Sequence, residues 1–174
     1  MIRWFRHLRD EDGSATIEFV ILGPFLFGMF LATYELGMLL TRQVMLERGL
    51  DLAVRSVRLG LVQEVTHDSI KDLICSKGMM IPDCVNQLRL EMVPIDPRGS
   101  GTLKADVDCV DRSTPVEEVR EFRPGISNDL MILRACALID PYFPSNVLGF
   151  PNIKTNAGQA FAITASSAFV IEPS

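Results

Sequence analysis

The residue whose chemistry stands out is Glu18, a carboxylate near the start of a long apolar run. It follows Gly13 by five positions, and the side chains from Ala15 to Leu40 are almost all apolar. An ionised carboxylate at the centre of a membrane-spanning helix costs about 2.5–3.5 kcal/mol on insertion scales. A residue this costly usually has a partner or a role, so we expect Glu18 to meet a positively charged group.

The apolar run has the length and composition of a membrane-spanning helix. From Ser14 to Leu40 the only ionisable side chains are Glu18, Tyr34 and Glu35. At about 1.5 Å per residue, the segment can cross a hydrocarbon core of about 30 Å. It is longer than the apolar region of a secretory signal peptide, and no clear small-x-small cleavage site follows it. The sequence therefore predicts a retained anchor.

A charged segment precedes this run. It contains Arg3, Arg6 and Arg9, followed by three consecutive acidic residues. Arginines beside the first apolar segment favour a cytoplasmic N-terminus, which places the remainder of the chain on the other side of the membrane.

Two features inside the run bear on its shape and contacts. Gly23 and Pro24 predict a kink, because proline removes one backbone hydrogen bond and clashes with the preceding turn. The kink is either a harmless bend or a flexible point used as subunits pack. Glu35 is expected near the outer interface, with Tyr34 as an aromatic belt residue, and a contact with another subunit is the alternative.

The helical pattern continues beyond the run. Apolar residues recur at steps of three or four, and charged residues take the opposite face. The apolar set is Leu46, Leu50, Ala53, Val57 and Leu61, and the charged set is Arg48, Asp51, Arg55 and Arg58. The pattern predicts one helix from about Ser14 to Gly60, with a globular head covering its amphipathic second half.

The sequence after this helix predicts the secondary structure of the globular head. Residues 65–75 read as a short helix, which Thr66 or Asp68 can cap. Alternating apolar and polar residues predict strands within 87–94, 104–110, 129–139 and 160–171. The predicted fold class is therefore α+β: a long N-terminal helix packed on a roughly four-stranded antiparallel sheet, with one further short helix.

All four cysteines follow the apolar run, at Cys75, Cys84, Cys109 and Cys136. An even number on one side of a membrane segment fits two disulfides in an oxidising compartment. Three pairings are possible, and we favour Cys75–Cys84, which closes a short loop, and Cys109–Cys136, which joins two predicted strands. Four free buried thiols are the alternative. The spacing does not fit a zinc site, so we expect no metal and no other cofactor.

Composition and motifs exclude two functional classes. A net charge of −5, with no basic tract beyond the first nine residues, argues against nucleic-acid binding. His67, Asp68 and Ser69 are adjacent on a predicted helix and point in different directions, so they do not form a catalytic triad. Asp106 and Asp108 could bind a cation, but a solvated strand face is the preferred interpretation. We expect no enzymatic activity.

The segment Gly13-Ser-Ala-Thr-Ile-Glu18-Phe19, between a charged leader and an apolar helix, resembles a type IV prepilin signal. With a proline soon after, it is most similar to the TadE/TadF family of minor pilins, or pseudopilins, from the tight-adherence (Flp-type) pilus system. Asp140-Pro-Tyr-Phe-Pro144 and the segment 165–172 resemble the aromatic/proline loop and last strand of that family. Phe19 stands where the major pilins commonly carry tyrosine.

The resemblance implies roles for the first residues of the helix. Prepilin peptidase would cut between Gly13 and Ser14 on the cytoplasmic side, which leaves a free α-amino group on Ser14. Glu18, next to Phe19, would pair with such an amine on its own subunit or on the next one. The pairing is chemically sound, because an α-amino group is largely protonated at neutral pH and a nearby carboxylate favours that charge.

The predicted organisation is a leader at 1–13, a transmembrane helix at 14–40 and a periplasmic or extracellular head at 41–174, which includes the helix extension 41–60. The predicted function is a structural minor pilin, single-pass in the bacterial inner membrane and able to join an extracellular pilus. Its partners would be other pilin and minor pilin subunits, prepilin peptidase, the inner-membrane assembly platform and the lipid bilayer. The alternative is an uncleaved, signal-anchored periplasmic scaffold or binding protein.

Overall fold

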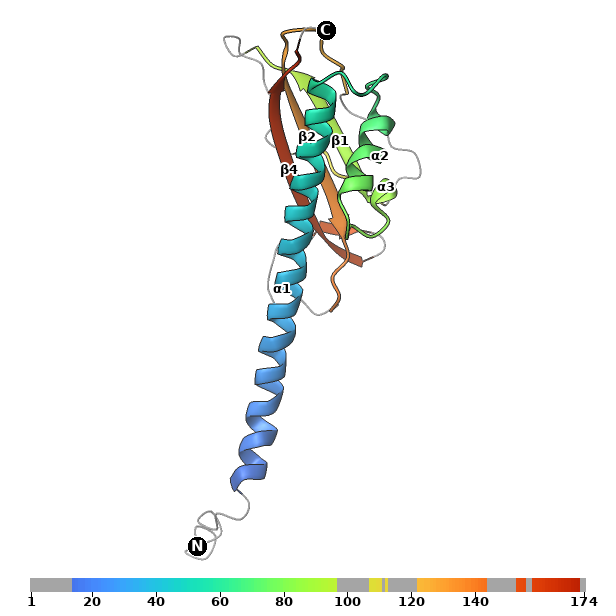
Figure 1. The fold of residues 1–174 in the computed structure, drawn as a ribbon. Helices are drawn as coiled ribbons and strands as arrows, with labels where there is room; N and C mark the ends of the chain where they lie inside the picture. Colours follow the sequence, from blue (N-terminus) through green and yellow to red (C-terminus); the bar gives the residue numbers. More distant parts are fainter. Residues whose placement is uncertain are drawn as a thin grey trace, which may run out of the picture.

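The computed structural model describes residues 14–96, 107–110, 112, 122–143, 153–155 and 158–172. A long helix leads into a head built from a sheet and short helices (Figure 1). The elements are, in chain order, α1 (Ser14–Arg58), α2 (His67–Lys77), α3 (Cys84–Gln87), β1 (Leu88–Pro94), β2 (Leu130–Ile139), β3 (Ile153–Thr155) and β4 (Gly158–Val170).

The predicted long helix is confirmed by α1, which extends over 45 residues as one helix. It continues through Gly23 and Pro24 without a break in its helical assignment, and the predicted kink stays a prediction. The predicted apolar stripe is buried except for Leu61, which is 70% exposed. Leu61 lies outside the core because the helix ends at Arg58 and Gly60 turns the chain away with φ +64°.

The strands form an antiparallel sheet in the order β1-β2-β4-β3. β2 is central and pairs with β4 along its whole length, from Leu130↔Val170 to Ile139↔Phe161. β1 pairs with the other edge of β2. β3 pairs only with the first three residues of β4. The body of the sheet is therefore three long strands, and β3 is a short addition at one corner.

The strand predicted within 104–110 is absent from the described part of that segment. The described part, residues 107–110, lies instead against the outer face of the sheet, the face away from α1. Asp108 pairs with Arg89 of β1 at 2.8 Å, and Cys109 is bonded to Cys136 of β2. Both contacts hold the segment on a sheet face, where its backbone has no ladder to join. Asp108 is also 8% exposed rather than solvated, which corrects the expectation for this carboxylate.

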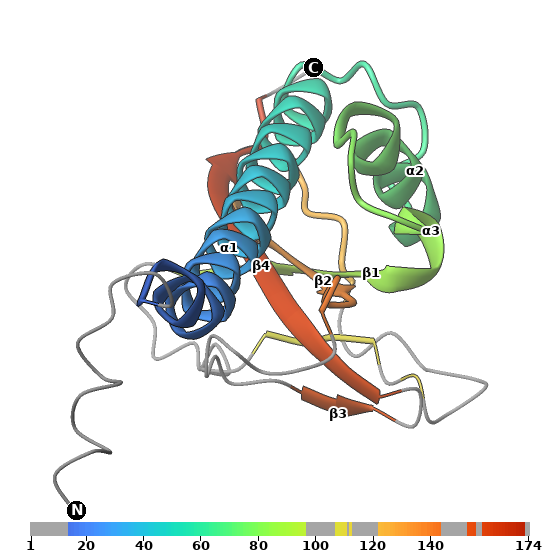
Figure 2. The same cartoon turned by 90° about the horizontal axis from the view of Figure 1, so that it is seen from below.

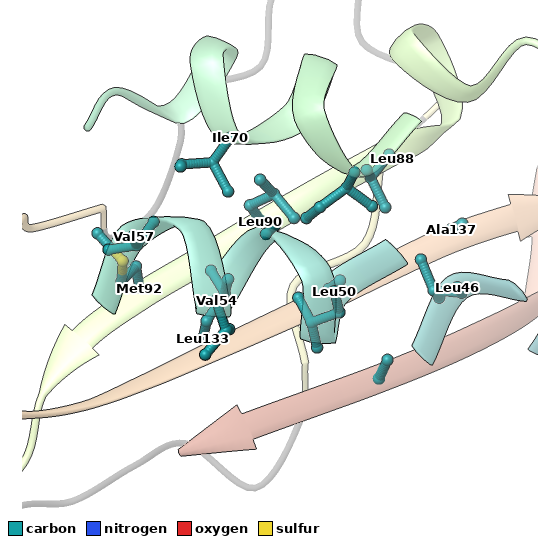
Figure 3. Packing of buried hydrophobic residues seen from close by; sticks show 14 of the residues in the cluster. Leu46, Leu50, Val54, Val57, Ile70, Leu88, Leu90, Met92, Leu133 and Ala137 are labelled. Carbon is teal, nitrogen blue, oxygen red and sulfur yellow. The ribbon is translucent and has the colours of Figure 1, made fainter. Parts of the chain in front are cut away.

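The hydrophobic core lies between the inner face of the sheet and the two helices α1 and α2, which lie on the same side of it (Figure 2). Alternate residues of β1 and β2 point into this layer, as the period-two pattern predicts. The close view in Figure 3 labels the residues that meet there: Leu46, Leu50, Val54 and Val57 of α1, Ile70 of α2, Leu88, Leu90 and Met92 of β1, and Leu133 and Ala137 of β2.

The outer face of β1 and β2 carries buried charges. Glu91 and Arg134 are cross-strand neighbours, each 8% exposed. The Arg134 guanidinium donates to the same Glu91 oxygen through Nη2 and through Nε, the latter at 3.0 Å. Arg89 and Asp108 form a second buried pair beside them. Charges this covered are tolerated because they are paired and hydrogen-bonded.

We predict that Glu91→Ala lowers the free energy of unfolding by about 3–5 kcal/mol, because it leaves the Arg134 guanidinium buried without this carboxylate. Replacing both partners, as in Glu91→Leu with Arg134→Met, should recover most of that loss. Urea unfolding of the full chain in detergent micelles measures both variants. Equal destabilisation by the single and the double variant would contradict this account.

Candidate functional site

The first half of α1 exposes apolar side chains on every side of the helix. Phe19 is 70% exposed and Phe30 is 72% exposed, and their neighbours differ little. A helix that is apolar all round requires lipid or partner helices to cover it. α1 is also the one helix in the described part of the chain that is long and apolar enough to cross a membrane. The exposed set is Ile17, Phe19, Val20, Ile21, Leu22, Phe25, Leu26, Phe27, Met29 and Phe30.

Glu18 lies one helical turn after the first residue of α1. The helix begins at Ser14, and Gly13 lies outside the described residues. Residues four apart are neighbours on a helix surface, so Ser14 and Glu18 share a face. The first backbone N–H groups of a helix have no intrahelical acceptor and give this end a partial positive charge. A carboxylate one turn away is suited to offset a positive group placed at this end.

Phe19 and Gly23 are in contact on the next face of the helix. A Cβ at Gly23 would lie 3.9 Å from two ring atoms of Phe19, and Gly23 is buried although its neighbours are exposed. The glycine therefore gives the aromatic ring a place against the backbone, directly before Pro24.

A polar cluster fixes α1 where it enters the head. Glu35 and Arg42 are both 5% exposed, and both contact Tyr142 from the segment after β2. The Tyr142 backbone N–H donates to Glu35 Oε1 at 3.1 Å. Arg42 Nη2 donates to the Tyr142 hydroxyl oxygen at 2.6 Å, and its guanidinium carbon lies 4.8 Å from the ring centroid. We call Glu35, Arg42 and Tyr142 the Tyr142 anchor.

The Tyr142 anchor was not predicted from the sequence. Glu35 was expected at the membrane interface or against another subunit, but its carboxylate is covered and hydrogen-bonded within its own chain. The sequence indicates this contact only weakly. Glu35 and Arg42 are seven positions apart and share a helix face, but Tyr142, an aromatic residue between two prolines, lies far along the chain. Only the tertiary fold brings these three residues together.

Two disulfides hold the outer parts of the head. Cys75–Cys84 joins the end of α2 to the start of α3, with the Cα atoms 5.7 Å apart. Cys109–Cys136 joins the outer segment to β2, with the Cα atoms 5.1 Å apart. These are the two pairs that the sequence favours, and no cysteine is free.

The adjacent residues His67, Asp68 and Ser69 start α2 rather than form a triad. Ser69 N–H donates to Thr66 Oγ1 at 3.2 Å, and Ser69 Oγ donates to the Glu64 carbonyl oxygen at 2.7 Å. The hydrogen bond with His67 lowers the pKa of the exposed Asp68 carboxyl. Thr66 and Ser69 form the capping box of α2, whereas His67 and Asp68 bond to each other at 3.0 Å. The described residues also contain no group of three or more His, Cys, Asp or Glu that could hold a metal ion.

These features define a class of protein: an α+β head attached to a helix whose first half is apolar and exposed. Residues 13–55 match the family model of TadE-like proteins. The match includes Gly13, Glu18 and Phe19, and it ends near the C-terminus of α1 before any strand begins. The resemblance found in the sequence is thus supported by an independent comparison over this segment. No curated protein and no solved structure matches the chain.

We predict that Tyr142→Phe lowers the free energy of unfolding of the head by about 1–3 kcal/mol, because the buried Arg42 loses an acceptor while the ring is kept. The matched control is Tyr34→Phe. Tyr34 is 50% exposed and contacts the Tyr142 ring at a centroid distance of 6.0 Å, and this contact survives the change. Urea unfolding in detergent should show a change of less than about 0.5 kcal/mol for the control. Equal effects of the two variants would argue against the anchor.

Proposed function

We propose that this chain is a structural minor pilin, or pseudopilin, of a Tad (Flp-type) pilus. The observation that carries the proposal is the bare apolar half of α1, which begins at Ser14 and has Glu18 one turn later, within a segment that matches TadE-like proteins. A helix of this kind is stable only in lipid or among other apolar helices. A subunit that passes from a membrane into a helical bundle meets both environments.

In the proposed topology the chain crosses the bacterial inner membrane once. Residues 1–13 form a cytoplasmic leader, and residues 41–174 lie on the periplasmic side. The arginines of the leader support this orientation. The disulfides support an oxidising compartment for the head. Prepilin peptidase would remove the leader after Gly13 at the cytoplasmic face, and the assembly platform would then draw the subunit toward its partner pilins.

Cleavage would create a positively charged group within one helical turn of Glu18. The new α-amino group would lie at the first residue of α1, where the partial positive charge of the helix end makes an uncompensated cation unfavourable. Glu18 lies one turn from this amine in its own subunit and, in an assembly of parallel helices, can also reach the amine of a neighbour. Either pairing reduces the cost of burying the carboxylate. No catalytic step is assigned to the chain.

The Tyr142 anchor would make helix and head move as one unit. Glu35 and Arg42 bind Tyr142 at the point where the bare half of α1 meets the head. Force applied to the helix during assembly would therefore pass directly to the sheet.

We predict that Gly13→Arg blocks removal of the leader, because the peptidase requires a small residue at the cleavage position. Intact mass of the protein from native membranes measures the outcome, and Ser14→Ala is the control that should still be processed. An unchanged mass difference between precursor and mature protein in Gly13→Arg would refute the assigned cleavage site. If the wild-type chain itself keeps its leader, the uncleaved scaffold becomes the preferred function.

We predict that Glu18→Ala and Glu18→Gln both leave membrane insertion and leader removal intact but impair assembly with partner pilins. An uncompensated buried charge costs about 3–5 kcal/mol, which corresponds to a loss of about 100-fold or more in the association constant. Pilus formation in a strain complemented with each variant measures the effect. The control is Glu47→Ala, which removes an exposed carboxylate of α1 within the head. Normal assembly with Glu18→Gln would exclude the amine pairing.

A further inference from the structure

Arg42 is a buried cation whose hydrogen-bonding capacity is only partly used. Its guanidinium contacts Tyr142 alone, through the hydroxyl at 2.6 Å and through the ring face, and the side chain is 5% exposed. Its Nε atom is covered and has no hydrogen-bond partner. Glu35, the carboxylate of the Tyr142 anchor, accepts from the Tyr142 backbone instead. Because buried charges are normally paired and hydrogen-bonded, this guanidinium has the capacity to bind an anion.

Arg42 also lines a pocket of about 400 Å³, which we call the Arg42 pocket. Its walls come from α1, from the segment that starts α3 and from the end of β2. The polar and charged residues of the wall are Arg42, Asp83, Gln87, Arg112, Asp140 and Tyr142. A pocket with several polar groups around one unpaired cation is suited to a small anionic group.

The other charges of the Arg42 pocket are already engaged. Arg112 forms an ion pair with Asp140, so these two charges compensate each other. Asp83 is exposed and accepts a hydrogen bond from Asn86 at 2.7 Å. The ion pairs between described residues do not include Arg42. Arg42 is therefore the charged group of this wall that an incoming anion can neutralise.

The position of Arg42 along α1 gives the level of the pocket in a membrane. With Ser14 at one face, a hydrocarbon core of about 30 Å takes up about 20 residues and ends near Tyr34. The headgroup layer extends about 5–8 Å further, and the Arg42 backbone lies about 12 Å further. Long side chains of a helix lean toward its N-terminus, which here brings the guanidinium toward the bilayer.

The surrounding elements agree with this level. β2 ends, and α3 lies, in the part of the head nearest the exposed half of α1 (Figure 1). The rings of Tyr34 and Tyr142 are in contact there, with their centroids 6.0 Å apart. Tyrosines are enriched at membrane–water interfaces. The Arg42 pocket therefore lies at the depth of the phospholipid headgroups.

We propose that Arg42 binds the phosphate of a phospholipid headgroup from the periplasmic leaflet in this pocket. Hydrogen bonds from a guanidinium to a phosphate are roughly twice as strong as those between neutral groups. The Tyr142 hydroxyl accepts from Arg42 and can donate its own proton to the same phosphate. The bound lipid would fix the height of the head above the bilayer. This proposal rests on the proposed anchoring of α1 in the inner membrane.

The test measures lipid binding to the full chain in detergent micelles by native mass spectrometry. The probes are phosphatidylglycerol, diacylglycerol with the same acyl chains, and inorganic phosphate. We expect the wild type to bind one phosphatidylglycerol at least about tenfold more tightly than either other probe. Arg42→Gln should remove this preference. The matched control is Arg48→Gln, which removes an exposed arginine of α1 and should bind as the wild type does.

A second variant guards against a change of fold in Arg42→Gln. Arg42→Lys keeps the positive charge and should bind phosphatidylglycerol more tightly than Arg42→Gln does. Equal binding of phosphatidylglycerol and diacylglycerol would overturn the proposal, as would equal affinities of the two Arg42 variants. Inorganic phosphate that binds as tightly as the lipid would indicate a free phosphate as the ligand and would overturn it too. Carbonate extraction of native membranes tests the anchoring separately, so failure of lipid binding and failure of the proposed function give different results.

Discussion

The structure depends on one constraint: α1 is a single helix that must satisfy two different environments. Its second half is amphipathic and forms part of the core of the head, with Leu46 and Leu50 almost completely buried. Among the described residues its first half has no such partner, and it presents apolar side chains on all sides. A soluble domain gains nothing from a long bare apolar helix, whereas a subunit that leaves a bilayer for a helical bundle needs one.

Several kinds of contact hold the head together and join it to α1. The core layer between α1, α2 and the sheet supplies the hydrophobic contribution, and the disulfides tie the peripheral segments to α2 and β2. Buried ion pairs on the outer face add directional contacts whose loss is costly once the charges are covered. The Tyr142 anchor acts at the exit of the helix from the head. These contacts join α1 to the head at several points.

Elements that depend on a local sequence pattern were predicted, whereas several contacts between residues far apart in the chain were not. Local periodicity predicted α1, α2 and the three long strands, because each carries its own apolar pattern. The alternating pattern gave a wrong prediction at 107–110, the described part of the strand predicted within 104–110, where a disulfide and an ion pair hold the chain on a sheet face. The three-residue β3 is too short to carry a pattern, and it was missed. Glu35 was placed by its position in the apolar run, but Tyr142, 107 positions later, decides its contact. Gly13 and Glu18 were singled out by their local spacing; both lie within the segment 13–55 that matches TadE-like proteins, and their roles stay a prediction.

The measurement that tests the central claim most directly is the N-terminal residue of the mature protein, read by sequencing and intact mass from native membranes. The account predicts Ser14 with a free α-amino group. That result would place a new positive charge at the start of α1, one turn from Glu18. An N-terminus at Met1 would contradict it, because the chain would then be a permanent anchor with no α-amino group at the start of α1.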